Sequence, residues 1–177
     1  SSAGWIIFII IIIVIGFAIA LSGGEQSSTT PSIKTTTTEA KAYYDKGMVY
    51  YKSEDYFQAI TYFNKVIELD PNHVGAYNRR GRSFLLSKDY PAAISDYTKV
   101  IGLEPRYVDA YDNRGYAYYR LGDYEKAISD YTKAIELEPT NAWAYSSRGR
   151  AYEKLGESEK AQLDLDKAAS LDPKFKR

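Results

Sequence analysis

The chain has 177 residues, which is enough for one repeat array with a short appendage and too few for several large domains. Its 23 basic and 23 acidic side chains give a formal net charge of zero and are spread through the chain, so no nucleic-acid partner is expected. Cysteine is absent, which excludes a disulfide framework and any metal or redox site built on cysteine.

The chain begins with a long apolar stretch. Residues Ala3 to Leu21 are nineteen in a row without a charged or strongly polar side chain. As a helix rising ~1.5 Å per residue, they would reach roughly 28 Å, close to the ~30 Å hydrocarbon core of a bilayer. Because Trp5 to Leu21 are apolar all round, we expect residues 1–21 to be a hydrophobic helix surrounded by lipid or by copies of itself. Its expected assembly residues are Trp5, Ile6, Phe8, Ile9, Ile12, Ile13 and Phe17.

Only Ser1 and Ser2 precede this stretch, with no initiator Met and no Lys or Arg. A secretory signal or an ordinary signal anchor would carry a basic flank, so this N-terminus indicates a processed product. It resembles the N-terminus that prepilin peptidase leaves on type IV pilins and their archaeal relatives, whose hydrophobic helices bundle into a filament core. Bacterial pilins usually have a Glu near the start of that helix, whereas the first acidic residue here is Glu25, so the archaeal style is the better match.

A polar segment follows the apolar stretch. Between Ser22 and Thr38, ten of seventeen residues are Ser or Thr, with two glycines and one proline. Such a composition cannot bury a core, so residues 22–39 are predicted to be a linker and a candidate for O-glycosylation.

The rest of the chain repeats with a period of 34 residues. Glycines recur at this period at Gly47, Gly81, Gly115 and Gly149. Four residues before each glycine stands a tyrosine, namely Tyr43, Tyr77, Tyr111 and Tyr145. Twelve residues after each glycine comes an alanine, and twenty-four after it a proline, namely Pro71, Pro105, Pro139 and Pro173.

This pattern over residues 40–175 resembles the tetratricopeptide repeat (TPR) family. The resemblance implies an all-α domain over residues 40–177, a right-handed α-solenoid of four helical hairpins with a concave groove. The four repeats are expected at 40–73, 74–107, 108–141 and 142–175. Their first helices (A) are expected at 40–53, 74–87, 108–121 and 142–155, and their second helices (B) at 56–69, 90–103, 124–137 and 158–171.

Charged residues recur within the repeats. Asp55, Asp89 and Asp123 stand where B helices begin, so we expect them to cap free backbone N–H groups. An Arg precedes the glycine in repeats two to four, and an Asp follows sixteen residues after it, whereas repeat one has Lys and Tyr at these places. We therefore predict three structural, partly buried ion pairs that fix helix A on helix B, in preference to a row of catalytic residues. The pairs are Arg80–Asp96, Arg114–Asp130 and Arg148–Asp164.

Tyrosine is unusually frequent, with 18 residues, and helical spacing puts several tyrosines on the A-helix face that lines the groove in this family. A lining of Tyr and Arg is typical of a binding surface, here for a protein, peptide or glycan partner. The candidate residues are Tyr44, Tyr51, Asn78, Arg82, Tyr116, Tyr119 and Arg150. Relatives that bind a C-terminal carboxylate place Lys and Asn where this chain has Tyr44 and Met48, although Arg82, Asn113 and Arg150 leave a shifted version of that mode open.

No catalytic constellation can be assembled from these residues, so no enzyme activity and no cofactor are expected. The single His73 lies in an inter-repeat turn and is predicted to be a solvated loop histidine. Two hypotheses for function remain. In the first, residues 1–21 polymerise after passing through the membrane, and the repeats decorate an extracellular filament or cell surface. In the second, they are a single membrane anchor for an adaptor whose repeats bind partner proteins. A further hypothesis is a thermophilic source, because the chain is rich in Ile and Tyr and has one Met, no Cys and only eight Asn plus Gln.

Overall fold

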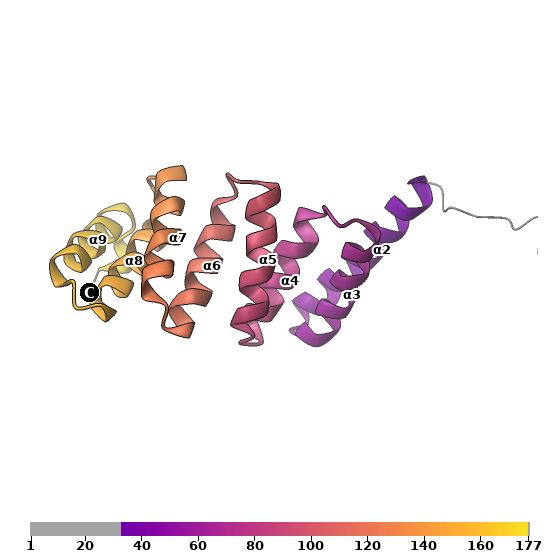
Figure 1. Cartoon of the computed structure of the whole chain (residues 1–177), viewed down its shortest axis with the longest axis horizontal. Coiled ribbons are helices and arrows are strands. Elements are labelled where there is room, and N and C mark those ends of the chain that lie inside the picture. The colour runs from indigo at the N-terminus through magenta and orange to yellow at the C-terminus, as the bar shows by residue number, and fades with distance from the viewer. Residues whose placement is uncertain (1–32, 177) are drawn as a thin grey trace, which may run out of the picture. The chain divides into compact units, whose positions relative to one another are not determined.

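The computed structural model describes residues 33–176, and every regular element in this part of the chain is helical (Figure 1). The elements are α2 (Ile33–Lys52), α3 (Tyr56–Leu69), α4 (Val74–Leu86), α5 (Tyr90–Leu103), α6 (Val108–Leu121), α7 (Tyr124–Leu137), α8 (Ala142–Lys154), α9 (Ser158–Leu171) and a final 3₁₀ turn, η1 (Pro173–Phe175). They form four helical hairpins, so the predicted all-α solenoid is confirmed. The hydrophobic segment 1–21 and its assembly residues lie outside the described residues.

The hairpins stack in chain order along one axis, from α2 to α9 (Figure 1). Each A helix packs on the B helix of its own repeat, and each B helix packs on the next A helix. The A helices also contact one another in sequence, α2 with α4, α4 with α6 and α6 with α8. Within residues 33–176 no helix is long and apolar enough to cross a membrane.

Helix α2 differs from its prediction because it begins at Ile33, seven residues before the expected start at 40. These added residues belong to the segment predicted to be a linker. Once residues 40–52 are held helical by packing, adding a further residue requires no new nucleation. Each Thr lowers helix stability by only a few tenths of a kcal/mol, so a Thr run does not stop the helix.

The B helices begin as predicted. The carboxylate of Asp55 accepts a hydrogen bond from the backbone N–H of Gln58 at 3.1 Å. Asp89 does the same for Ala92 at 3.2 Å, and Asp123 for Lys126 at 3.3 Å. The fourth B helix has Glu157 at this place, whose side chain makes no capping bond.

The repeating glycines mark the closest approach of helix A to helix B. A Cβ atom at Gly47 would lie 2.7 Å from the ring of Phe63, and one at Gly115 would lie 2.9 Å from the ring of Tyr131. At Gly149 the nearest atom would be Cγ of Leu165, at 3.0 Å. Distances below 3.0 Å are too short for carbon atoms, so α2 and α6 need a glycine opposite the aromatic ring of the B helix in the same repeat, whereas at Gly149 the contact would be tight.

Candidate interaction groove

The predicted Arg and Asp side chains are brought together in all three repeats. Arg114 donates from Nε to Asp130 Oδ2 and from Nη2 to Oδ1, both at 2.8 Å. The other two pairs, Arg80–Asp96 and Arg148–Asp164, are also bidentate, with distances between 2.5 and 2.9 Å. The Asp side chains are buried, and the hydrogen bond to Asp130 raises the pKa of the Arg114 guanidinium.

Each arginine also binds the preceding repeat. Nη1 of Arg80 donates to Asn64 on α3 at 2.6 Å, whereas the corresponding atoms of Arg114 and Arg148 donate to threonine hydroxyls. These hydroxyls belong to Thr98 on α5 and Thr132 on α7, both at 3.0 Å. A single guanidinium therefore joins three helices from two repeats.

Repeat one replaces the ion pair with aromatic contacts. The ring of Tyr62 stacks on that of Tyr50, with centroids 5.3 Å apart and planes 8° from parallel. The ammonium groups of Lys46 and Lys65 lie 5.9 and 5.6 Å from the Tyr62 ring centroid. Because no repeat precedes this one in the described chain, an arginine here would have no third partner comparable to Asn64.

A second set of pairs joins each A helix to the residue before the next A helix, 29 positions on. Tyr44 stacks on His73 with ring centroids 5.2 Å apart. Asn78 donates from Nδ2 to the hydroxyl of Tyr107 at 2.9 Å. Asn141 donates from Nδ2 to Oδ2 of Asp112 at 2.7 Å. These three contacts occupy equivalent positions, yet their chemistry differs from one repeat to the next.

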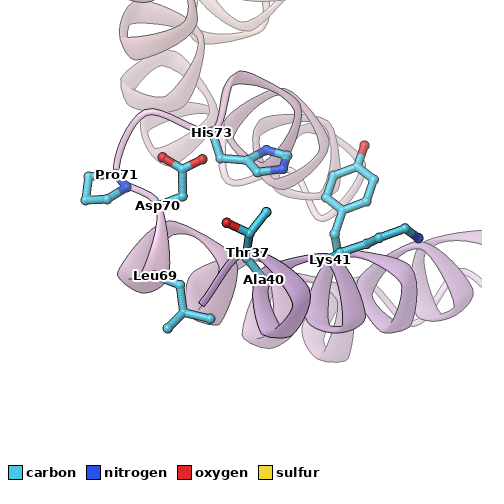
Figure 2. A pocket seen from close by; sticks show the side chains of 8 residues that line it. Thr37, Ala40, Lys41, Leu69, Asp70, Pro71 and His73 are labelled. Carbon is cyan, nitrogen blue, oxygen red and sulfur yellow. The ribbon is translucent and has the colours of Figure 1, made fainter. Parts of the chain in front are cut away.

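His73 is therefore not the solvated loop histidine that the sequence predicted. It is half-buried, and its Nδ1 accepts a hydrogen bond from the backbone N–H of Ala76 at 3.0 Å, which caps α4. Figure 2 shows it beside a pocket between α2 and the turn that follows α3. The pocket is lined by Thr37, Ala40, Lys41, Tyr44, Leu69, Asp70, Pro71 and His73.

Three further pockets adjoin one another along α4, α6 and α8, and all three include Arg82 and Asn113 in their walls. The other residues of the first pocket are Tyr51, Asn78, Arg79, Tyr107 and Asp109. Those of the second pocket are Leu85, Leu86, Lys88, Tyr90, Tyr116, Arg120 and Trp143. Those of the third pocket are Asp109, Asp112, Glu138, Asn141 and Trp143. Arg82 and Asn113 are joined by a hydrogen bond of 3.0 Å from Nη1 to Oδ1. We name this continuous hollow the interaction groove.

The structure brings some of the predicted groove residues together and separates others. Tyr51, Asn78, Arg82 and Tyr116 line the interaction groove, whereas Tyr44 lines the pocket beside α2. Tyr119 and Arg150 line none of these pockets. Tyr116 is half-buried and accepts a hydrogen bond from Nη1 of Arg120 at 2.7 Å, and the Tyr119 ring packs edge-on against Tyr124.

One groove residue that the sequence prediction missed, Asp112, is unusual. Its side chain is buried, and Oδ1 has no hydrogen-bond partner within residues 33–176. Burial raises the pKa of the Asp112 carboxyl to about 7. The hydrogen bond from Asn141 opposes this rise, and the negative charges of Asp109 and Glu138 add to it. Its position in the repeat was visible in the sequence, since it follows Asn78 by 34 residues, but its burial was not.

Family models agree with the repeat period. Models described as tetratricopeptide repeat match residues 40–73 and 142–175, and one described as TPR repeat matches 81–122 and 115–156. The chain therefore belongs to the tetratricopeptide repeat family. No curated protein sequence matches it.

Solved structures include close matches to the fold. MamA from Desulfovibrio magneticus RS-1 is 27% identical with a TM-score of 0.74, over 80% of this chain and 80% of that one. The first TPR domain of human RPAP3 is 30% identical with a TM-score of 0.63, over 68% of this chain and 95% of that one. The first TPR of Spaghetti (RPAP3) bound to the HSP90 peptide SRMEEVD is 29% identical with a TM-score of 0.65, over 67% and 94%. The chain is thus similar to scaffolds for protein interaction.

Proposed function

We propose that the repeats are a non-enzymatic scaffold that binds an extended segment of a partner protein in the interaction groove. The observation that supports this most is the continuity of the three pockets through Arg82 and Asn113 across α4, α6 and α8. Both polar and aromatic side chains line this groove, which suits both the backbone and the side chains of an extended segment.

A similar protein with a bound peptide supports the proposal that the repeats bind an extended segment, since the first TPR of Spaghetti (RPAP3) binds the HSP90 peptide SRMEEVD. This chain has Tyr44 and Met48 at the places where Lys and Asn grip a carboxylate in the family, so we do not expect the same peptide to bind. Asp109, Asp112 and Glu138 in the third pocket would also repel its acidic side chains.

Peptide selection from a random display library on the full-length chain tests this proposal. We expect selected peptides to lose at least about tenfold in affinity for Arg82→Ala, because this side chain is common to all three pockets. Arg106→Ala, which removes an exposed arginine from an inter-repeat turn, is the matched control and should change nothing. Failure to select any peptide, or equal affinity for both variants, would contradict the proposal.

A second proposal concerns residues 1–21, which lie outside the described residues. We propose that this segment assembles copies of the chain into an extracellular filament of pilin type. Its support is the run from Trp5 to Leu21, whose burial at ~1.5 to 3 kcal/mol for each large side chain would exceed any groove contact. The alternative is a single membrane anchor with the repeats outside the bilayer.

Electron microscopy of material sheared from cells separates these alternatives. We expect filaments from the full-length chain and none from Ile11→Glu, because the variant would bury an unpaired charge. Deleting residues 1–21 should give a soluble, folded solenoid. Detergent-solubilised monomers with no filaments on cells would establish the anchor instead.

A further inference from the structure

The third pocket of the interaction groove carries more negative than positive charge. It has a volume of about 450 Å³ and includes the carboxylates of Asp109, Asp112 and Glu138 but only one cation, Arg82. Asp109 and Glu138 are exposed, and within residues 33–176 their carboxylates form no ion pair or hydrogen bond. Arg82 donates to Asn113 and to neither acid. The pocket therefore has unneutralised negative charge.

The fold does not require a carboxylate at position 112. The equivalent residue one repeat earlier is Asn78, whose amide makes the equivalent contact, to Tyr107, the residue before the next A helix. Asp112 is only 8% exposed, and one of its oxygens is left buried without a partner in the described chain. A buried, half-satisfied carboxylate is unfavourable for folding, and such groups concentrate at binding sites.

Trp143 adds an aromatic surface to the same pocket. Its side chain is 39% exposed, and its ring packs edge-on against the buried Tyr131, with centroids 5.7 Å apart. This contact fixes the indole while leaving part of it open to the pocket. An indole ring beside carboxylates is the combination that binds a planar cation best, through cation–π attraction and charge-assisted hydrogen bonds.

The size of the cation follows from the spacing of the acids. Within residues 33–176, no three His, Cys, Asp or Glu side chains are close enough to hold a metal ion. A guanidinium is larger, has five N–H donors in a plane, and can reach separated carboxylates at once.

We propose that this pocket binds an arginine side chain of the partner segment, with its guanidinium between the carboxylates of Asp109 and Glu138 and stacked on Trp143. When Asp112 in the pocket wall is ionised, its buried charge strengthens the attraction, because it is screened little by water. This inference rests on the proposed function of the interaction groove and names the chemistry of one part of its ligand.

The emission of Trp143 provides a direct test in the full-length chain, with Trp5→Phe to remove the other indole. The probe is N-acetyl-arginine amide, and its uncharged isostere N-acetyl-citrulline amide is the control ligand. We expect saturable binding of the arginine probe with a dissociation constant of roughly millimolar, and no response to citrulline up to about 50 mM. No saturation, or an equal response to both probes, would overturn the proposal.

Variants assign the effect to the pocket. Asp112→Asn keeps the acceptor for Asn141 and reproduces the residue found at position 78, so it should fold and weaken arginine binding about tenfold. Glu138→Gln should have a similar effect, whereas Glu104→Gln, its counterpart one repeat earlier, should have none. Unchanged binding by Asp112→Asn would contradict the inference. If display peptides bind and depend on Arg82 but are indifferent to Asp112→Asn, the inference alone fails; if no peptide binds, the proposed function fails.

Discussion

The two sets of contacts that join neighbouring helices differ in how uniform they are. The pairs sixteen residues apart are the same bidentate Arg–Asp contact in repeats two to four. The pairs twenty-nine residues apart have a different chemistry each time: a ring stack at Tyr44–His73, an amide to a hydroxyl at Asn78–Tyr107, and an amide to a carboxylate at Asp112–Asn141.

This difference separates what the fold needs from what a ligand needs. The A and B helices of each repeat pack in the same way, so the same Arg–Asp contact can join them in repeats two to four. A bound segment of another protein has no 34-residue period, and residues that recognise it have no reason to repeat. The uniform contacts should therefore control stability, and the variable ones should control binding with smaller effects on stability.

Removing a uniform contact should have the largest effect. Arg114→Ala leaves the buried carboxylate of Asp130 without its partner and frees Thr98, so we expect a loss of ~3 kcal/mol in the free energy of unfolding. Urea denaturation measures it. Arg120→Ala, which removes an exposed arginine from the same helix, is the control and should change the free energy of unfolding much less. Equal losses would show that the ion pair is not a special determinant of stability.

Asp112, which belongs to the variable pairs, should make the free energy of unfolding depend on pH. Because its pKa rises from 3.8 to about 7 on folding, the folded state binds the extra proton between these values. The stability that protonated Asp112 contributes is complete below about pH 4 and is lost as the pH rises through 7.

Asp112→Asn removes this dependence. We expect the variant to match the natural chain near pH 4 and to exceed it by roughly 2 kcal/mol near pH 8, less than the ~4 kcal/mol that the whole shift would give in a rigid site. Thermal melts of both proteins across this range test it. A constant difference between them would show that Asp112 does not titrate in this window.

Much of the fold could be predicted because the same residue types recur at the same positions every 34 residues. The recurring glycines defined this period, and in the structure the ring of Tyr131 lies opposite Gly115. The spacing of Arg114 and Asp130 likewise predicted a contact between helices A and B, since both residues recur in step with the glycine.

The groove was less predictable because its residues do not recur. Asp112 and Asn141 lie at opposite ends of the third repeat, and the equivalent pairs in the other repeats consist of different residues, so only the fold shows that they touch. Trp143 likewise enters the groove through the stacking of α8 on α6, which no local pattern encodes. The early start of α2 depends on cooperativity with packed residues further along the helix.

The variable pair at His73 also has a structural part. His73→Ala removes the acceptor for the N–H of Ala76 and the stack on Tyr44, so we expect a loss of ~1 kcal/mol. His73→Asn should recover most of this loss, because Asn141 caps the equivalent helix with the same bond. Chemical denaturation distinguishes the two; equal losses would mean that the stack, and not the cap, stabilises this junction.

The turn between helices A and B has a backbone conformation that is the same in every repeat and side chains that vary. The smallest change in stability that we predict is for a substitution in this turn. Its backbone is uniform, with left-handed φ values of 62° at Glu54, 65° at Lys88, 84° at Gly122 and 77° at Gly156. Its side chains are not uniform, and Lys88 adopts this strained conformation while lining the same pocket as Tyr116 and Trp143. Lys88→Gly should relieve strain and stabilise the chain by about 0.5 kcal/mol, whereas Gly122→Ala should destabilise it by about 1. If Lys88 is kept for recognition, the stabilised variant should bind acidic-flanked display peptides more weakly, since it loses a cation from the groove. A variant that is both more stable and an equal binder would place this turn with the uniform contacts.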